Sequence, residues 1–220
     1  MRRPFVAEEM PRRYRVPVVI CLLWCAQTLA QTGEVPEAHA VREAAAVVAS
    51  LHDALFELGA GKELSIDERY ILLVPIVTET HDLPFIARFV LRRFWDDLDA
   101  TERAQFVERF ATLSVMNYAS RFAGFDPERV NVSGAESVNA TRVQVDATLQ
   151  TPDDGELTLS YTLHLADEKW MIVNIVAGGV SDLALRRSEY SKVMNEDGYD
   201  ALLKYVEGQT ARLAEGMPQF

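Results

Sequence analysis

The spacing of hydrophobic positions predicts helices in the first half of the chain. Residues 38–58 carry apolar side chains at three- and four-residue steps, which form one stripe along a helix: Val41, Ala45, Val48, Leu51, Leu55 and Leu58. Ser65, with Glu68 three residues later, predicts the capping box of a second helix. Pro75 should kink or divide that helix, because proline lacks the N–H that an interior position donates.

Two further helices are indicated before residue 123. Asp82 is a favourable N-cap and Pro84 stands in the first turn of a helix that continues to the large apolar pair Phe94 and Trp95. Asp99 or Thr101 caps the next helix, which runs to about residue 122. Its main apolar line is unusually aromatic, with Asn117 and Arg121 at the far end: Phe106, Phe110 and Leu113, flanked by Val107, Ser114 and Tyr118.

After residue 124 the period changes from that of helices to that of strands. Residues 130–133, 137–150, 156–166 and 169–177 are rich in β-branched residues, and the middle two segments alternate polar and apolar side chains. Residues 153–155 (Asp-Asp-Gly) and 167–168 (Asp-Glu) are short turns. Strands joined in this way form an antiparallel meander, with one face available to an apolar partner.

The last strand leads through Gly178 and Gly179 into helical sequence. The glycines permit a sharp turn, and Ser181 or Asp182 caps a helix to about residue 195. A final helix runs from Gly198 or Asp200 to about residue 214. The chain therefore predicts an α+β fold, with N-terminal helices and two C-terminal helices packed on one face of a curved antiparallel four-stranded sheet.

The N-terminal 30 residues form a separate unit. Arg12, Arg13 and Arg15 precede a short apolar run that ends in small residues, the pattern of a secretory signal, whose true start is Met1 or Met10. We therefore expect a signal peptide over 1–30, a disordered lead-in over 31–37, a single domain over 38–215, and a periplasmic location. Cleavage removes both cysteines, Cys21 and Cys25, and so excludes thiol chemistry.

Composition narrows the function further. Hydrophobic residues make up 49% of the 220 residues, enough for one domain with a substantial core. The net charge is −11, and it becomes −14 when residues 1–30, with five arginines and two glutamates, are removed. Such an acidic chain, without a basic cluster along the sequence of its body, argues against nucleic acid as a partner.

The sequence contains little that indicates catalytic chemistry. The sequence contains no nucleotide-binding glycine loop, no zinc-protease motif and no serine-hydrolase elbow, and we predict no cofactor and no metal. His81 and Asp82 form the only adjacent acid–imidazole pair, which a helix start explains better. The carboxylates at Asp96, Asp97 and Asp99 lack the glycine and the terminal glutamate of a calcium loop.

The remaining signal is an excess of large apolar side chains for one core. Ordinary packing explains it, and a cavity between helices and sheet is the sharper alternative. We expect such a cavity to be lined by Phe85, Ile86, Phe89, Val90, Trp95, Phe106, Phe110, Leu113, Tyr118, Tyr161, Val173, Ile175, Val180 and Tyr190.

An ordered set of short segments resembles the MlaC-type periplasmic phospholipid-binding proteins, also called the toluene-tolerance auxiliary family. The resemblance extends over nearly the whole chain after the signal, from about Val41 to Leu213. Its carriers, with Trp95, are 81–88 (HDLPFIAR), 103–110 (RAQFVERF), 117–122 (NYASRF), 170–175 (WMIVNI), 179–181 (GVS), 187–190 (RSEY) and 198–203 (GYDALL).

This resemblance implies a non-catalytic, monomeric carrier in an ABC-type lipid transport system that maintains outer-membrane lipid asymmetry. Acyl chains would fill a deep apolar pocket. The implied partners are lipid, an outer-membrane lipoprotein–porin complex and an inner-membrane MCE-domain ABC transporter. The chain departs from the family at Asn174 (usually Asp), at Gly178 (usually Glu) and at Arg186 (usually Tyr). Residues 117–125 also resemble the hopanoid-associated branch, so hopanoid-type lipids are the alternative cargo.

Two other hypotheses remain open at this point. A small α+β hydrolase- or isomerase-like enzyme would use Asp82 with His81, or Asp146, as a base on an apolar substrate. An adaptor without a ligand would use its acidic surface as the interface, and its binding would be sensitive to salt.

Overall fold

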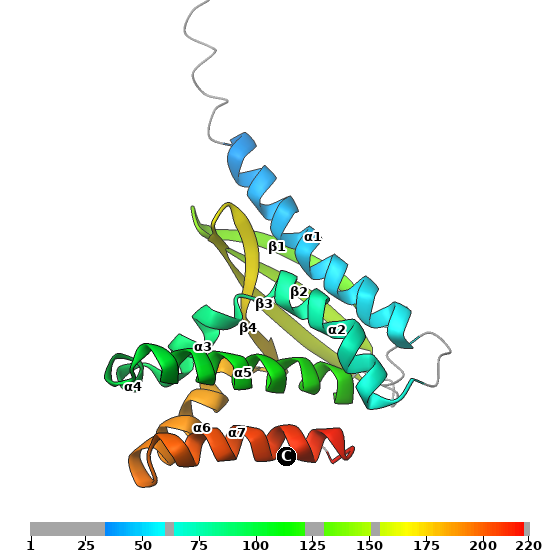
Figure 1. Ribbon diagram of the computed structural model, residues 1–220. Coiled ribbons are helices and arrows are strands. Elements are labelled where there is room, and N and C mark those ends of the chain that lie inside the picture. Colours follow the sequence, from blue (N-terminus) through cyan, green and yellow to red (C-terminus); the bar gives the residue numbers. More distant parts are fainter. Residues whose placement is uncertain (1–33, 60–63, 122–129, 151–154, 218–220) are drawn as a thin grey trace, which may run out of the picture. The chain divides into compact units, whose positions relative to one another are not determined.

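The computed structural model describes residues 34–59, 64–121, 130–150 and 155–217 (Figure 1). The chain divides into a short unit, Met1–Pro36, and a compact unit, Glu37–Phe220. The elements are α1 (Glu34–Gly59), α2 (Ile66–Thr80), α3 (Leu83–Leu91), α4 (Arg93–Asp97), α5 (Ala100–Arg121), β1 (Val130–Asn139), β2 (Arg142–Gln150), β3 (Glu156–Ala166), β4 (Lys169–Ala177), β5 (Val180–Ser181), α6 (Asp182–Glu196) and α7 (Tyr199–Ala214). The predicted α+β class is confirmed. The predicted signal, 1–30, lies outside the described residues, and α1 begins within the predicted lead-in.

The strands form one antiparallel sheet in chain order, β1-β2-β3-β4-β5, as a meander requires (Figure 1). The fifth strand, beyond the four predicted, is only two residues long and pairs with the end of β4. The turn between β3 and β4 is formed by Asp167 and Glu168, whose φ angles of 47° and 64° suit the twist of a two-residue hairpin.

A second hairpin lies inside the segment for which one strand, 137–150, was predicted. The side chain of Asn139 accepts hydrogen bonds from the backbone N–H and the hydroxyl of Thr141, at 3.0 and 3.2 Å. This local side-chain turn reverses the chain between β1 and β2, and asparagine favours such turns for that reason. The predicted turn at 153–155 lies mostly outside the described residues, although β2 and β3 pair as it requires.

Side-chain caps begin the helices where the sequence indicates. Ser65 and Glu68 form the reciprocal capping box of α2, and Asp82 accepts from the N–H of Phe85 at 3.0 Å to cap α3. Asp99, rather than Thr101, caps α5, since its carboxylate accepts from the N–H of Glu102 at 2.8 Å. Pro75 does not divide α2, which continues as one helix to Thr80.

Helix α5 is central to the packing. It lies against α2, α3 and α7, and its Phe106, Phe110 and Leu113 are fully buried (Figure 1). Helix α1 buries the predicted stripe from Val48 to Leu58. Its His52 also shares a 2.8 Å hydrogen bond with the Tyr161 hydroxyl, which ties α1 to β3.

The junction between α2 and α3 is attached to the sheet by its backbone. The N–H of Asp82 donates to the carbonyl of Ile172 in β4 at 3.1 Å, and His81 forms a bridge with the same residue. Helix α6 packs against α3, α7 and β4. Helices α3, α5 and α6 are thereby held around β4, and the space among them contains the candidate site. No helix in the described part of the chain is long and apolar enough to cross a membrane.

Candidate functional site

A cavity of about 350 Å³ lies among α3, α5, α6 and strands β3 to β5. Most of its lining is aliphatic or aromatic: Leu83, Ile86, Phe110, Tyr118, Leu159, Tyr161, Ile172, Val173, Ile175, Ala177, Val180, Leu183 and Leu185. Its polar lining consists of His81, Ser114, Asn117, Arg121, Asn174, Asp182 and Arg186. The volume falls at the lower end of the range of roughly 300–1,000 Å³ that is usual for small-molecule pockets.

A β-bulge gives β4 its unusual share of this lining. Thr162 of β3 pairs with Asn174 and the next residue pairs with Ile172, so Val173 is the extra residue of the bulge. The bulge resets the alternation of the strand, and Ile172 and Val173 are both buried and both line the cavity. A regular strand would place these two neighbours on opposite faces.

The cavity opens near the start of α6. Val180 and Leu185 line it and yet are 61% and 47% exposed, whereas Val173 is only 3% exposed. Apolar side chains therefore extend from the closed end of the cavity to its mouth. Such a path suits a long apolar group that enters by one end.

His81 lies in the wall as a neutral imidazole. It shares hydrogen bonds of 2.9 Å with the hydroxyls of Thr80 and Tyr118, and burial lowers its pKa to about 4. Burial likewise raises the pKa of Tyr118 well above its ordinary value. The two rings are thus uncharged at neutral pH, and they form a polar but unionised part of the lining.

Arg186 supplies the buried charge of the site. Its Nε donates to the Asp182 carboxylate at 2.7 Å, and its guanidinium lies 5.7 Å from the centre of the Phe110 ring. Burial disfavours the charge of Arg186, but the neighbouring Tyr190 and Asp182 outweigh this effect and raise its pKa. The arginine therefore stays ionised beside the apolar lining.

Asn117 adds an acceptor to the same wall. Its Nδ2 donates to the carbonyl of Leu113 at 3.0 Å, while its Oδ1 is buried and has no hydrogen-bond partner in the described part of the chain. A buried acceptor of this kind is costly to leave unpaired. It is positioned to accept a hydrogen bond from a polar group of a ligand in the cavity.

The acid–imidazole pair suggested by adjacent residues does not form. The imidazole of His81 bonds Thr80 and Tyr118, and Asp82 instead lies 2.9 Å from Nε2 of His164 in β3. Asp146 contacts Gln144 of its own strand and lies outside the cavity lining. Among the described residues, no group of three His, Cys, Asp or Glu is placed to hold a metal ion.

The fold separates the fourteen predicted lining residues into three groups. Seven line the cavity: Ile86, Phe110, Tyr118, Tyr161, Val173, Ile175 and Val180. Val90, Phe106, Leu113 and Tyr190 are fully buried in the core, and Trp95 packs against it from α4. Phe85 and Phe89 line a different hollow, described next.

This second hollow is a groove of about 810 Å³ on the outer side of α3, α4 and α6. It is lined by Phe85, Arg88, Phe89, Leu91, Arg92, Arg93, Phe94, Asp96, Arg187 and Ser191. Residues 85, 88, 89 and 92 follow one face of α3, whereas Leu83 and Ile86 reach the cavity from another face. Helix α3 thus separates two hollows of different chemistry.

Thirteen residues of the cavity lining, among them all of its polar members and Ile172 beside the bulge, were not predicted from the sequence. They are His81, Leu83, Ser114, Asn117, Arg121, Leu159, Ile172, Asn174, Ala177, Asp182, Leu183, Leu185 and Arg186. The Ser181 cap gave a usable signal for Leu183 and Leu185, because it marks them as the first turn of a helix that follows a strand of the lining. No local signal marks the bulge.

Comparison with known proteins gives two findings. Residues 49–207 match the model of a family described as MlaC protein. The structure of a phospholipid-binding protein from Ralstonia solanacearum, solved in complex with a phospholipid, superposes with a TM-score of 0.66 at 17% identity, over 80% of this chain and 98% of that one. At this identity the likeness shows a shared fold. No curated protein sequence gives a significant match.

Proposed function

The chain belongs to the MlaC protein family, and on this premise we propose that it is a phospholipid carrier that holds acyl chains in the cavity beside β4. The observation that carries the proposal is the continuous apolar lining from Val173 at the closed end to Val180 at the mouth. The phospholipid-bound relative of the same fold supports the choice of cargo. The protein transfers its cargo without catalysis.

The cavity suits a cargo that is held by its tails. Each buried methylene contributes about 0.8 kcal/mol, so one tail of about 16 carbons gives on the order of 13 kcal/mol and two give about 25. The second figure exceeds the practical affinity limit of roughly 20 kcal/mol. A carrier must also release its cargo, so opening of the mouth or partial exposure of a tail offsets part of this free energy.

The polar lining gives the cargo its orientation. Arg186 is ionised and can donate to the phosphate or ester oxygens of a lipid, whereas the buried acceptor of Asn117 suits a hydroxyl or ammonium group of the head group. Tails deeper in the cavity meet Ile172, Val173 and Tyr161. The alternative cargo, a hopanoid-type lipid, would fill the same apolar space with a rigid ring system.

The cellular setting belongs to the same proposal. The protein acts in the periplasm after cleavage of residues 1–30. It exchanges lipid as a monomer between an outer-membrane lipoprotein–porin complex and an inner-membrane MCE-domain ABC transporter, and so maintains outer-membrane lipid asymmetry. Family membership supports this setting.

Native mass spectrometry of protein purified from the periplasm tests the carrier function. We expect a co-purified phospholipid, and fragmentation of the complex distinguishes it from a hopanoid. Protein that is consistently empty, and takes up neither lipid from vesicles, would refute the proposal.

Two matched valine substitutions show whether the cargo passes the mouth of the cavity. Val180→Asp places a carboxylate at the mouth, and Val138→Asp does the same on β1, at similar exposures of 61% and 56%. Both changes should alter the free energy of unfolding by less than about 0.5 kcal/mol, because both sites are exposed. Lipid occupancy should fall roughly tenfold, about 1.4 kcal/mol, in the first variant alone. Equal lipid occupancy in the two variants would show that the lipid does not enter the cavity past Val180.

A further inference from the structure

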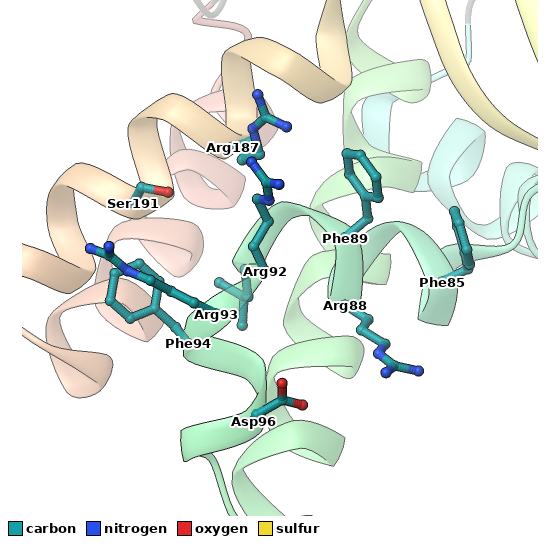
Figure 2. Close-up of a pocket in the computed structure, with 10 residues that line it drawn as sticks. Phe85, Arg88, Phe89, Arg92, Arg93, Phe94, Asp96, Arg187 and Ser191 are labelled. Atoms are coloured by element: carbon teal, nitrogen blue, oxygen red, sulfur yellow. The ribbon is translucent and has the colours of Figure 1, made fainter.

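The groove outside α3 collects four arginines, three from residues 88–93 and one from a distant part of the sequence. Arg88 and Arg92 come from α3 and the residue that follows it, Arg93 from α4 and Arg187 from α6 (Figure 2). A single carboxylate, that of Asp96, shares the lining. We expected no basic cluster in this acidic chain. The fold assembles one, on a molecule whose net charge is −11.

Three of the four guanidinium groups in the groove are available to a ligand. Within the described part of the chain, the side chains of Arg88 and Arg92 make no hydrogen bond or ion pair, and Arg187 only covers the Phe89 ring at 5.9 Å. Arg93 is already engaged, since it donates to the side chain of Asn195 at 2.8 Å and lies 4.8 Å from the centre of the Phe94 ring, so it contributes mainly its charge. In Figure 2 the side chains of Arg92 and Arg187 extend toward the same side of the groove. Like charges that share a groove repel each other unless an anion lies between them.

The backbone at Arg92 adopts a strained conformation for a residue that carries a side chain. Its φ of 49° and ψ of −118° are angles that glycine adopts freely and other residues avoid. The residue connects α3 to α4, where glycine would relieve the strain. Such strain clusters at functional sites and ligand clamps, where the surrounding structure holds it in place.

Phosphate is the anion that best matches these groups. A guanidinium forms paired hydrogen bonds with phosphate oxygens, and several can share one phosphate. The aromatic walls add an apolar component, since Phe89 is 38% exposed and Phe85 lies beside it, their ring centres 6.2 Å apart. The groove therefore suits a ligand in which a phosphate adjoins apolar atoms. A phospholipid head group, with the start of its acyl chains at a membrane surface, has this chemistry.

We propose that the groove formed by Arg88, Arg92, Arg93 and Arg187 binds the phosphate-bearing head group of an anionic phospholipid at a membrane surface. This inference rests on the proposed carrier function, because it brings the carrier to the lipids that it exchanges. The groove orients the molecule, with its basic face toward the bilayer and most of its acidic surface away from it.

Vesicle flotation at low salt tests the proposal. The vesicles are phosphatidylcholine alone, or phosphatidylcholine with about 30% phosphatidylglycerol. Wild-type protein should bind the second kind preferentially, and added salt should release it. Arg92→Gly should keep or raise the melting temperature while weakening binding roughly fivefold, the effect expected for one basic residue near an anionic surface. This variant cannot lose binding through misfolding if its melting temperature holds.

A matched pair of triple variants separates the groove from net charge. Arg88→Gln with Arg92→Gly and Arg187→Gln should reduce binding on the order of 100-fold, from three such contributions. Arg42→Gln with Arg142→Gln and Lys204→Gln removes the same charge from exposed positions outside the groove and should leave binding within roughly threefold. Equal losses in the two triples, or no preference of the wild type for phosphatidylglycerol, would overturn the assignment.

Inorganic phosphate distinguishes a free ion from a lipid. Calorimetric binding of phosphate that requires the groove arginines, together with no binding to phosphatidylglycerol vesicles, would assign the groove to free phosphate and overturn the lipid assignment. Native mass spectrometry keeps the two proposals apart. Groove variants that fail to float with the vesicles but still carry lipid support both the carrier function and the head-group site. Wild-type protein that floats but holds no lipid refutes only the carrier function.

Discussion

At the scale of single residues, the site depends on polar groups held in apolar surroundings. His81 is buried between Thr80 and Tyr118 and stays neutral, while Arg186 stays charged because Asp182 and Tyr190 stabilise it. The same imidazole belongs to the segment that attaches the start of α3 to β4. Its protonation therefore bears on both the fold and the cavity wall.

Stability should fall in mild acid because of His81. Burial lowers its pKa from 6.5 to about 4, so between these values the unfolded chain binds a proton that the folded chain does not. This contribution to stability is present above pH 6.5 and is lost as the pH falls toward 4. Chemical unfolding at two pH values should show a loss of about 2 kcal/mol between roughly pH 7 and pH 5 from this residue.

His81→Gln provides the comparison for the pH experiment. The amide can still bond Tyr118 but cannot titrate. Between pH 7 and pH 5, the free energy of unfolding of the variant should therefore fall by about 2 kcal/mol less than that of the wild type. Every other titrating group is common to both proteins, including His52, whose pKa burial also lowers. Identical pH dependence in the two proteins would show that His81 is not held neutral.

At the scale of elements, the turn between β4 and α6 shapes the mouth of the cavity. Gly178 and Gly179 adopt φ angles of 55° and 83°, and β5 follows at once with Val180 in the cavity lining. A side chain at Gly178 would also approach Leu157, at 3.0 Å from its Cδ1. The angle between β4 and the segment that leads into α6 therefore depends on Gly178 and Gly179, two positions that disfavour any residue other than glycine.

Gly179→Ala and Gly208→Ala should have effects of opposite sign. Neither added methyl group meets an atom within 4 Å, so the backbone alone decides the outcome. At Gly179 the positive φ should lower the free energy of unfolding by about 1–3 kcal/mol. At Gly208, inside α7, alanine should raise it by about 0.5–1 kcal/mol. Thermal unfolding of the two variants measures both, and destabilisation at both positions would contradict the assigned angles.

The same turn permits a test of its part in exchange. Gly179→Val should distort the approach to α6 and slow the transfer of lipid between vesicles, whereas Gly208→Val, inside α7, should leave the rate unchanged. Both rates are measured at a temperature at which both variants are folded. Transfer at the wild-type rate would show that the turn has no part in exchange.

At the scale of the whole molecule, bound lipid and fold should stabilise each other. A ligand present at about 100 times its dissociation constant adds about 2.7 kcal/mol to the free energy of unfolding. For a domain of this size, each kcal/mol shifts the melting temperature by about 2–4 °C. Protein stripped of lipid should therefore melt roughly 5–10 °C below the loaded protein.

Reloading the stripped protein with phospholipid should restore the higher melting temperature, which serves as the control. If mass spectrometry confirms that the lipid was removed and the melting temperature does not change, the lipid does not bind within the fold. The adaptor hypothesis would then gain support, since it needs no internal ligand and relies on the acidic surface.

Local pattern was sufficient for most of the architecture. The helical spacing in α1, the caps at Ser65, Asp82 and Ser181, and the alternation in β3 each depend on residues within a few positions of one another. For that reason the sequence alone determined the α+β class, the meander and the family resemblance. It missed the β1–β2 turn at Asn139, because the side-chain hydrogen bonds that form it lie inside an alternating segment.

Only the tertiary structure decided which apolar residues line the cavity. Phe106 and Phe110 stand four residues apart on one face of α5, yet only Phe110 borders the cavity. Phe106 packs against the buried Tyr190 ring of α6, whereas Phe110 lies beside Arg186 of the same helix, which belongs to the lining. The bulge at Val173, the pairing of Asp82 with His164 and the arginine groove have the same origin. Each joins residues distant in sequence, and no local pattern encodes which distant residue will lie opposite. Periodicity predicts which residues are buried, whereas the lining of a site also depends on which residues of distant elements lie opposite them.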